Sequence, residues 1–158
     1  MSHFLFIAGA LRERSSKESA EHQLSAGVWG LCTALIRENL EKFLTPQSHG
    51  LVYVLKSGIC ANFRIASGIQ SYAALDDLMK DELRTEARYG FIRIEVLGRY
   101  DSSAGQSQNL LQSVLNLPDQ AELTRRLTLG MHRLTEEEYQ ALLGGLKSAE
   151  PSGASMLS

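Results

Sequence analysis

The side chains that most often carry chemistry in proteins are scattered along this chain. The histidines lack the HxxxH spacing of a metal site and are His3, His22, His49 and His132. The two cysteines, Cys32 and Cys60, lie in apolar stretches, with no CxxC pair and no histidine nearby. We therefore expect buried free thiols, as in a reducing compartment, in place of a metal site or a disulfide.

Motifs of nucleophilic and phosphate chemistry are also absent from the sequence. It has no GxSxG turn, no P-loop, no GxGxxG after a strand and no EF-hand loop. Acidic pairs such as Asp76-Asp77 stand at the starts of expected helices, where negative charge interacts favourably with the helix dipole. The sequence therefore predicts no enzymatic activity, no cofactor and no metal.

The one tryptophan, Trp29, has the greatest potential for binding. It lies between Val28 and Gly30 at the start of an amphipathic stretch. A ring at this place could anchor the core beneath a helix. It could also form a pocket wall, because aromatic rings stack on nucleobases with about 1–3 kcal/mol per contact and attract methylated or cationic groups. The residues alone leave both interpretations open.

Length and composition indicate one folded domain. The chain has 158 residues, of which 44% are hydrophobic and 22% charged. Its net charge of −2 and pI near 6.1 provide no global basic field, so a polyanion would have to meet a local basic patch. The apolar run Phe4–Leu11 is too short to span a membrane and follows no Lys or Arg. We expect a cytoplasmic protein without membrane association.

Hydrophobic periodicity predicts the elements that must position Trp29. Strands are expected at Phe4–Ile7, Leu51–Leu55, Ile59–Ile69 and Phe91–Leu97, and helices at 20–24, 32–44, 75–83, 110–115 and 135–146. Leu51–Leu55 is apolar throughout, which predicts a strand in the middle of a sheet, paired antiparallel with the next one. The stretch Leu123–Met131 is ambiguous, and Thr135 with Glu138 forms a capping box for the last helix.

These elements do not alternate regularly as βαβ units. They predict an α+β domain over residues 1–147, with a mixed or antiparallel, barrel-like β-sheet flanked by helices. Residues 148–158 contain too few apolar side chains to pack and are expected to form a disordered tail.

Several short segments, taken in order, are similar to a known family. They are Gly27–Gly30, Asn39–Phe43, Leu51–Leu55, Ser57-Gly58 and Phe63–Gly68, with Phe4–Ile7 at the start and Leu134–Tyr139 at the end. Together they resemble the EVE domain and its relative the YTH domain, both of the PUA-like superfamily. The resemblance spans roughly residues 3 to 146. It implies a PUA-like β-barrel flanked by helices, with a pocket for a modified nucleobase in DNA or RNA.

The resemblance also implies which residues form that pocket. Trp29 matches the family's Val-Trp position, whose ring forms one wall of the aromatic cage in YTH domains. The neighbours Gly30 and Leu31 match positions whose backbone groups approach the base. The remaining matches are Tyr53 and Leu55, on the strand that reaches the pocket, and Gly9 and Ala10, where the first strand ends. The chain lacks a second tryptophan for the cage.

We therefore hypothesise a module that binds DNA or RNA carrying a modified base, flipped out of a duplex where necessary. Flanking phosphates would be held by Lys56, Arg125, Arg126 and Arg133, unless these are ordinary solvated side chains. The alternative is a small-molecule or protein-interaction module with a PUA-like fold and no nucleic-acid binding. On the first hypothesis, Trp29→Ala removes binding and leaves the protein folded.

Overall fold

A computed structural model describes residues 2–9, 15–101 and 103–146 of the chain. The strands are β1 (His3–Ala8), β2 (Val28–Gly30), β3 (His49–Val54), β4 (Gly58–Ile65), β5 (Phe91–Arg99) and β6 (Met131–Leu134). The helices are α1 (Ser16–Ala26), α2 (Ala34–Phe43), α3 (Asp77–Glu82), α4 (Ala104–Val114), α5 (Gln120–Leu127) and α6 (Glu136–Gly144), with a 3₁₀ turn, η1 (Tyr72–Ala74). The expected tail, residues 148–158, lies outside the described residues.

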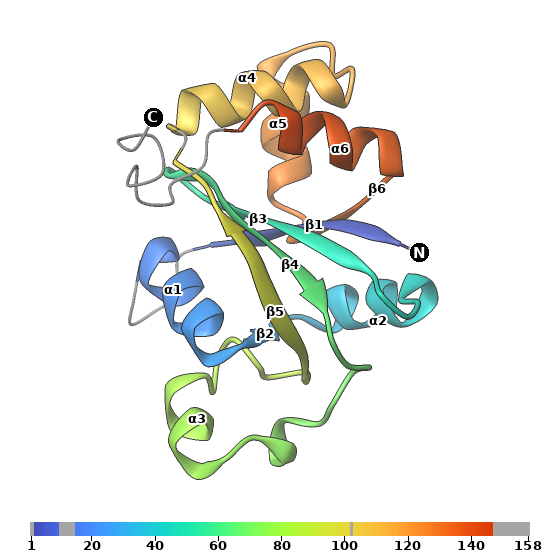
Figure 1. Cartoon of the computed structure of the whole chain (residues 1–158). Coiled ribbons are helices and arrows are strands. Elements are labelled where there is room, and N and C mark those ends of the chain that lie inside the picture. The colour runs from blue at the N-terminus through green and yellow to red at the C-terminus, as the bar shows by residue number, and fades with distance from the viewer. Residues whose placement is uncertain (1, 10–14, 102, 147–158) are drawn as a thin grey trace, which may run out of the picture.

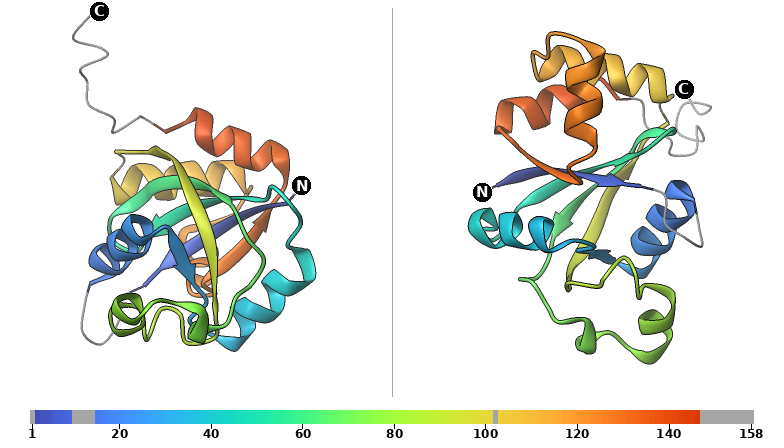
Figure 2. Two further views of the ribbon diagram at one scale, coloured as in Figure 1. Left: turned by 60° about the horizontal axis from the view of Figure 1, so that its bottom comes forward. Right: turned by 180° about the vertical axis from the view of Figure 1, so that it is seen from behind.

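The six strands form one mixed sheet in the order β2-β5-β4-β3-β1-β6. Strands β1 and β3 run parallel, and the other neighbouring pairs are antiparallel. Register shifts interrupt the β3–β4 and β4–β5 ladders, and such irregularities increase the local twist. The sheet curls into a half-barrel (Figure 2), which confirms the expected α+β fold with a barrel-like sheet.

Both faces of the sheet are covered by helices (Figure 1). Leu5 and Ile7 of β1 pack in a cluster with side chains of α4, α5 and α6. Phe4 and Phe6 point to the opposite face, in a second cluster with side chains of α1 and α2. Because β1 and β3 are buried on both faces, their sequences are apolar at nearly every position. The central place predicted for β3 is confirmed.

The predicted strands are confirmed as β1, β3, β4 and β5, although β4 ends at Ile65 instead of Ile69. The structure contains two strands, β2 and β6, that the sequence analysis did not predict. Residues 28–30, interpreted there as the start of a helical stretch, form β2, and residues 131–134 form β6. Strands of three and four residues are too short to show a period-two pattern. The ambiguous stretch before β6 contains most of α5.

The start of α6 confirms the predicted capping box. Glu138 N donates to Thr135 Oγ1 at 3.0 Å, and Thr135 N donates to Glu138 Oε1 at 2.8 Å. One turn on, Tyr139 is buried against the sheet, and Asn62 Nδ2 donates to its hydroxyl at 3.0 Å. The Tyr139 ring also lies against His3, with 4.7 Å between centroids. The last helix is therefore fixed over the first strand.

The histidines His3 and His49 face each other across the parallel pair β1–β3, with ring centroids 5.9 Å apart. Burial lowers the pKa of His3, and repulsion from His49 lowers it further, although Glu136 opposes the shift. Burial, followed by repulsion from Arg64, lowers the pKa of His49. The folded protein therefore favours both imidazoles in the neutral form.

This arrangement predicts a loss of stability in mild acid. Because the folded-state pKa values lie below the ordinary value of about 6.5, the stabilisation is complete above that pH and declines as the pH falls through it. We expect the urea midpoint of the wild type to fall between pH 7.5 and pH 5.5, and that of His3→Gln/His49→Gln to fall less. The control is His22→Gln at an exposed position. An identical pH dependence in the double variant and the wild type would contradict this account.

Candidate functional site

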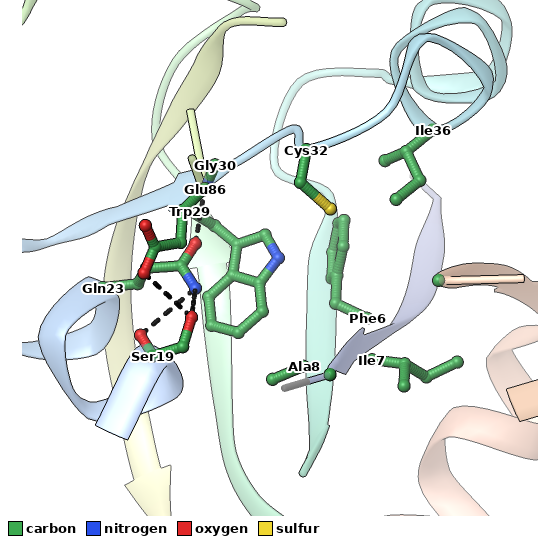
Figure 3. Close-up of a pocket in the computed structure, with 12 residues that line it drawn as sticks. Phe6, Ile7, Ala8, Ser19, Gln23, Trp29, Gly30, Cys32, Ile36 and Glu86 are labelled. Atoms are coloured by element: carbon green, nitrogen blue, oxygen red, sulfur yellow. Dashed lines mark hydrogen bonds between the residues drawn. The ribbon is translucent and has the colours of Figure 1, made fainter. Parts of the chain in front are cut away.

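A small cavity lies between α1 and the end of β1, with Trp29 as one wall (Figure 3). Its volume is about 30 Å³, which suits about one water molecule. The apolar part of its lining includes Phe6, Ala8, Gly9, Cys32, Ile36 and Gly130. The polar part consists of Ser19, Gln23 and Glu86.

Trp29 belongs to the core and to the cavity at once. Its side chain is 4% exposed, and its ring lies 6.1 Å from the ring of Phe6 and 6.0 Å from that of Phe63, between centroids. The indole nitrogen points towards Cys32 and Phe6 (Figure 3), and none of the described groups accepts a hydrogen bond from it. The two interpretations of Trp29 left open by the sequence are therefore compatible.

A chain of hydrogen bonds joins three segments beside the Trp29 ring (Figure 3). Gly30 N donates to Gln23 Oε1 at 2.8 Å, and Gln23 Nε2 donates to the carbonyl oxygen of Ser19 at 3.2 Å. Ser19 Oγ donates to Glu86 Oε2 at 3.0 Å. All three side chains are buried, where polar groups without partners would be costly. The network connects α1, β2 and the segment after α3.

Gly30 is required by the close approach of another segment. A Cβ atom at this position would lie 2.2 Å from the carbonyl oxygen of Glu86 and 2.7 Å from Ala87 N. Only glycine leaves room for that backbone. Three residues earlier in the chain, Gly27 ends α1 in the left-handed conformation, with φ of 71°, and directs the chain into β2. The two glycines thus set the path on which Trp29 lies.

Three of the predicted pocket residues, Gly9, Trp29 and Gly30, line the cavity together. Leu31 follows them in the chain but is fully buried. Its N–H donates to the carbonyl oxygen of Gly90, and its carbonyl accepts from Tyr89 N, both at 2.9 Å. The backbone N–H and carbonyl groups of Leu31 are therefore hydrogen-bonded to other backbone groups of the protein.

Two other predicted pocket residues, Tyr53 and Leu55, lie elsewhere. Tyr53 points to the opposite face of the sheet, where Gln108 Nε2 donates to its hydroxyl at 3.4 Å. Leu55 packs mainly with that same cluster, although its Cδ1 lies 3.6 Å from where a Cβ on Gly9 would be. Ala10 lies outside the described residues.

The predicted phosphate-binding residues are spread over three elements. Arg125 and Arg126, near the end of α5, both form ion pairs with Glu122, at 2.5 and 3.5 Å. The guanidinium of Arg133 on β6 lies 4.0 Å from the centroid of the Phe43 ring. Lys56 is exposed in the turn between β3 and β4. That turn lies at the end of the sheet where β1 also ends.

The thiols of Cys32 and Cys60 are free, as the sequence predicts, but they are partly buried instead of fully buried. Burial, reinforced by the negative charge of Glu86, raises the pKa of Cys32, although a backbone hydrogen bond opposes the shift. Burial raises the pKa of Cys60 to about 11. Both are therefore neutral near pH 7 and are poor nucleophiles.

Neither a metal centre nor a membrane span is found in the described part of the chain. No three side chains of His, Cys, Asp or Glu gather there in a way that could hold a metal ion. Its helices are all too short or too polar to cross a membrane.

Solved structures resemble this arrangement, whereas no protein-family model and no curated protein sequence matches the chain. Human THYN1, in a complex with DNA containing 5-methylcytosine, superposes with a TM-score of 0.60 and 15% identity, over 93% of this chain and 99% of that one. The YTH domain of Mmi1 superposes with a TM-score of 0.50 and 12% identity, over 82% of this chain and 94% of that one. The chain has a PUA-like fold. Protein PSPTO5229 from Pseudomonas syringae also shares this fold, with a TM-score of 0.59 and 12% identity over 90% and 97%.

The sequence did not single out the polar residues of this cavity. Ser19 and Gln23 stand four residues apart on one face of α1, and Ser15 with Glu18 forms a capping box that marks the start of that helix. That signal could have placed both side chains on the buried face. Glu86 gives no comparable signal, since it lies in a charged stretch typical of a solvated segment.

Replacing Gln23 should destabilise the protein measurably. Gln23→Leu leaves the buried N–H of Gly30 without an acceptor, which costs about 1–3 kcal/mol. The free energy of unfolding in urea measures this cost. Gln140→Leu on the exposed face of α6 is the control and should change stability by less than about 0.5 kcal/mol. Equal effects of the two substitutions would show that the hydrogen bond to Gly30 is unimportant.

Proposed function

We propose that this protein binds a modified nucleobase in DNA or RNA, with the base stacked on Trp29. The observation that carries the proposal is the position of the one tryptophan at the wall of a cavity with a buried polar side, in a PUA-like fold. It is supported by the structural similarity to THYN1, whose structure contains 5-methylcytosine DNA.

The side chains around the cavity suit the chemistry of a base. The Trp29 ring supplies a flat apolar face, and stacking on it contributes about 1–3 kcal/mol. The indole N–H is a hydrogen-bond donor, and Glu86 with Ser19 brings acceptor oxygens to the opposite side. A carboxylate accepts well from an exocyclic amine such as N4 of cytosine. A methylated cytosine is therefore the first base to test.

Binding requires the cavity to open. Its volume of about 30 Å³ is roughly a tenth of the 300 Å³ at the lower end for small-ligand pockets. The Trp29 wall must therefore move relative to β1 or α1 before a base enters. The free energy of that opening lowers the apparent affinity.

Flanking phosphates are assigned, in this proposal, to Lys56, Arg125, Arg126 and Arg133. Arg125 and Arg126 would exchange their ion pairs with Glu122 for contacts with phosphate. Few phosphate contacts and a net charge of −2 correspond to a shallow dependence of affinity on salt.

The second candidate is a PUA-like module for a small molecule or a protein, without nucleic-acid binding. The small volume of the cavity and the ion pairs of Arg125 and Arg126 favour it. It requires that no oligonucleotide bind in a salt-dependent manner, which titrations at two ionic strengths measure.

The test of the proposal uses Trp29→Leu. Trp29→Ala is unsuitable, because removing a buried ring costs about 3–5 kcal/mol and threatens the fold. We expect Trp29→Leu to weaken binding to an oligonucleotide with 5-methylcytosine by about tenfold or more, through the loss of stacking. Fluorescence anisotropy of a labelled oligonucleotide measures the affinity.

The matched control is Phe63→Leu. Phe63 packs on Trp29 in the same core cluster but does not line the cavity. Phe63→Leu should lower the stability of the protein about as much as Trp29→Leu does and leave its affinity for the modified oligonucleotide unchanged. Equal affinities of Trp29→Leu and Phe63→Leu for the modified oligonucleotide would contradict the proposal.

A further inference from the structure

Two exposed leucines directly precede residues that line the cavity. Leu129 is 45% exposed and directly precedes Gly130, while Leu35 is 53% exposed and directly precedes Ile36. Gly130 and Ile36 both line the cavity, and a Cβ on Gly130 would lie 2.7 Å from Ile36 Cδ1. The backbone positions of both exposed leucines are therefore next to residues of the same cavity wall, although neither leucine lines the cavity itself.

Leu129 projects from a turn that is fixed on both sides. Its N–H donates to the carbonyl oxygen of Arg126 at 3.2 Å, which ties it to the end of α5. On the other side, the carbonyl oxygen of Gly130 accepts from Ile7 N at 2.9 Å, next to β1. Gly130 has φ of 84°, a conformation that favours glycine. The backbone of Leu129 is thus fixed between the end of α5 and the cavity-lining Gly130, and its side chain is exposed to solvent.

An exposed leucine side chain at this position is suited to filling the gap that a flipped base leaves in a duplex. A base that leaves a duplex leaves a gap in the stack, and closing or filling that gap offsets the cost of unstacking. Proteins that unstack DNA commonly insert leucine, isoleucine, methionine or phenylalanine between base steps. Arg125 and Arg126, one turn before Leu129, pair with Glu122 and would have to release it to hold the phosphates beside such a gap.

We propose that Leu129 inserts into the gap in the base stack left by the base that enters the Trp29 cavity. This inference rests on the proposed function and adds that the partner is double-stranded. In a single strand, no paired stack has to be kept open. Leu129 should therefore contribute to duplex binding and have little effect on single-strand binding.

The test compares one sequence with 5-methylcytosine, as a duplex and as a single strand. Leu129→Ala should weaken duplex binding by about tenfold, as expected for losing the burial of a leucine side chain. Single-strand affinity should change by less than about twofold. Leu97→Ala is the matched control, because Leu97 is 46% exposed on β5 and does not line the cavity. It should change neither affinity.

A second readout follows the DNA. With 2-aminopurine beside the methylated base, the wild type should raise the fluorescence of the duplex on binding, since the neighbouring stack is opened. Leu129→Ala should give a smaller rise at saturation.

Several outcomes would overturn the insertion of Leu129. They are equal weakening of duplex and single strand, no weakening of either, or a wild-type dimer in sedimentation that Leu129→Ala abolishes. If Trp29→Leu weakens binding while Leu129→Ala does not, only this inference fails. If the wild type binds neither oligonucleotide, this inference fails, and so does the proposed function as far as 5-methylcytosine in DNA is concerned.

Discussion

The absence of a side chain at residue 30 is the constraint on which the pocket depends. The backbone of Glu86–Ala87 lies directly on the α-carbon of Gly30, so the Glu86 side chain reaches the cavity from a segment more than fifty residues away. The N–H of the same glycine is bound by Gln23, which ties α1 to β2. Helix α1, strand β2 and the distant segment after α3 therefore meet at one residue. The position of Trp29 follows from that junction as much as from its own packing.

The parts of the fold that could be predicted are those with long, regular patterns. Ile92, Ile94 and Val96 alternate with Arg93 and Glu95, and the structure buries the first set more than the second. Strands β2 and β6 could not be predicted, because they are short and exist only through their partners β5 and β1. Helix α1 has few apolar side chains, so its capping box was its main signal.

The candidate site was accessible from the sequence only in part. Trp29 stood out by its type, and the glycines by their place next to it. Tyr53 shows why the rest could not be found. In a strand that is apolar at every position, alternation fixes that neighbours face opposite ways but not which face each takes. The structure turns Val52 and Val54 towards the Trp29 side and Tyr53 away from it. Glu86 is buried by tertiary contacts alone.

The place of β1 in the sheet has a consequence for how the chain is made. The first strand of the protein lies between β3 and β6, and its second neighbour is supplied by residues 131–134. A ribosome adds about 5–20 residues per second, so an interval on the order of ten seconds separates the synthesis of these two strands. During that time the nascent chain carries an apolar strand with one edge unpaired and one face uncovered. An unpaired strand edge is a template for pairing with other chains, so the late synthesis of β6 lengthens the exposure of the nascent chain to aggregation.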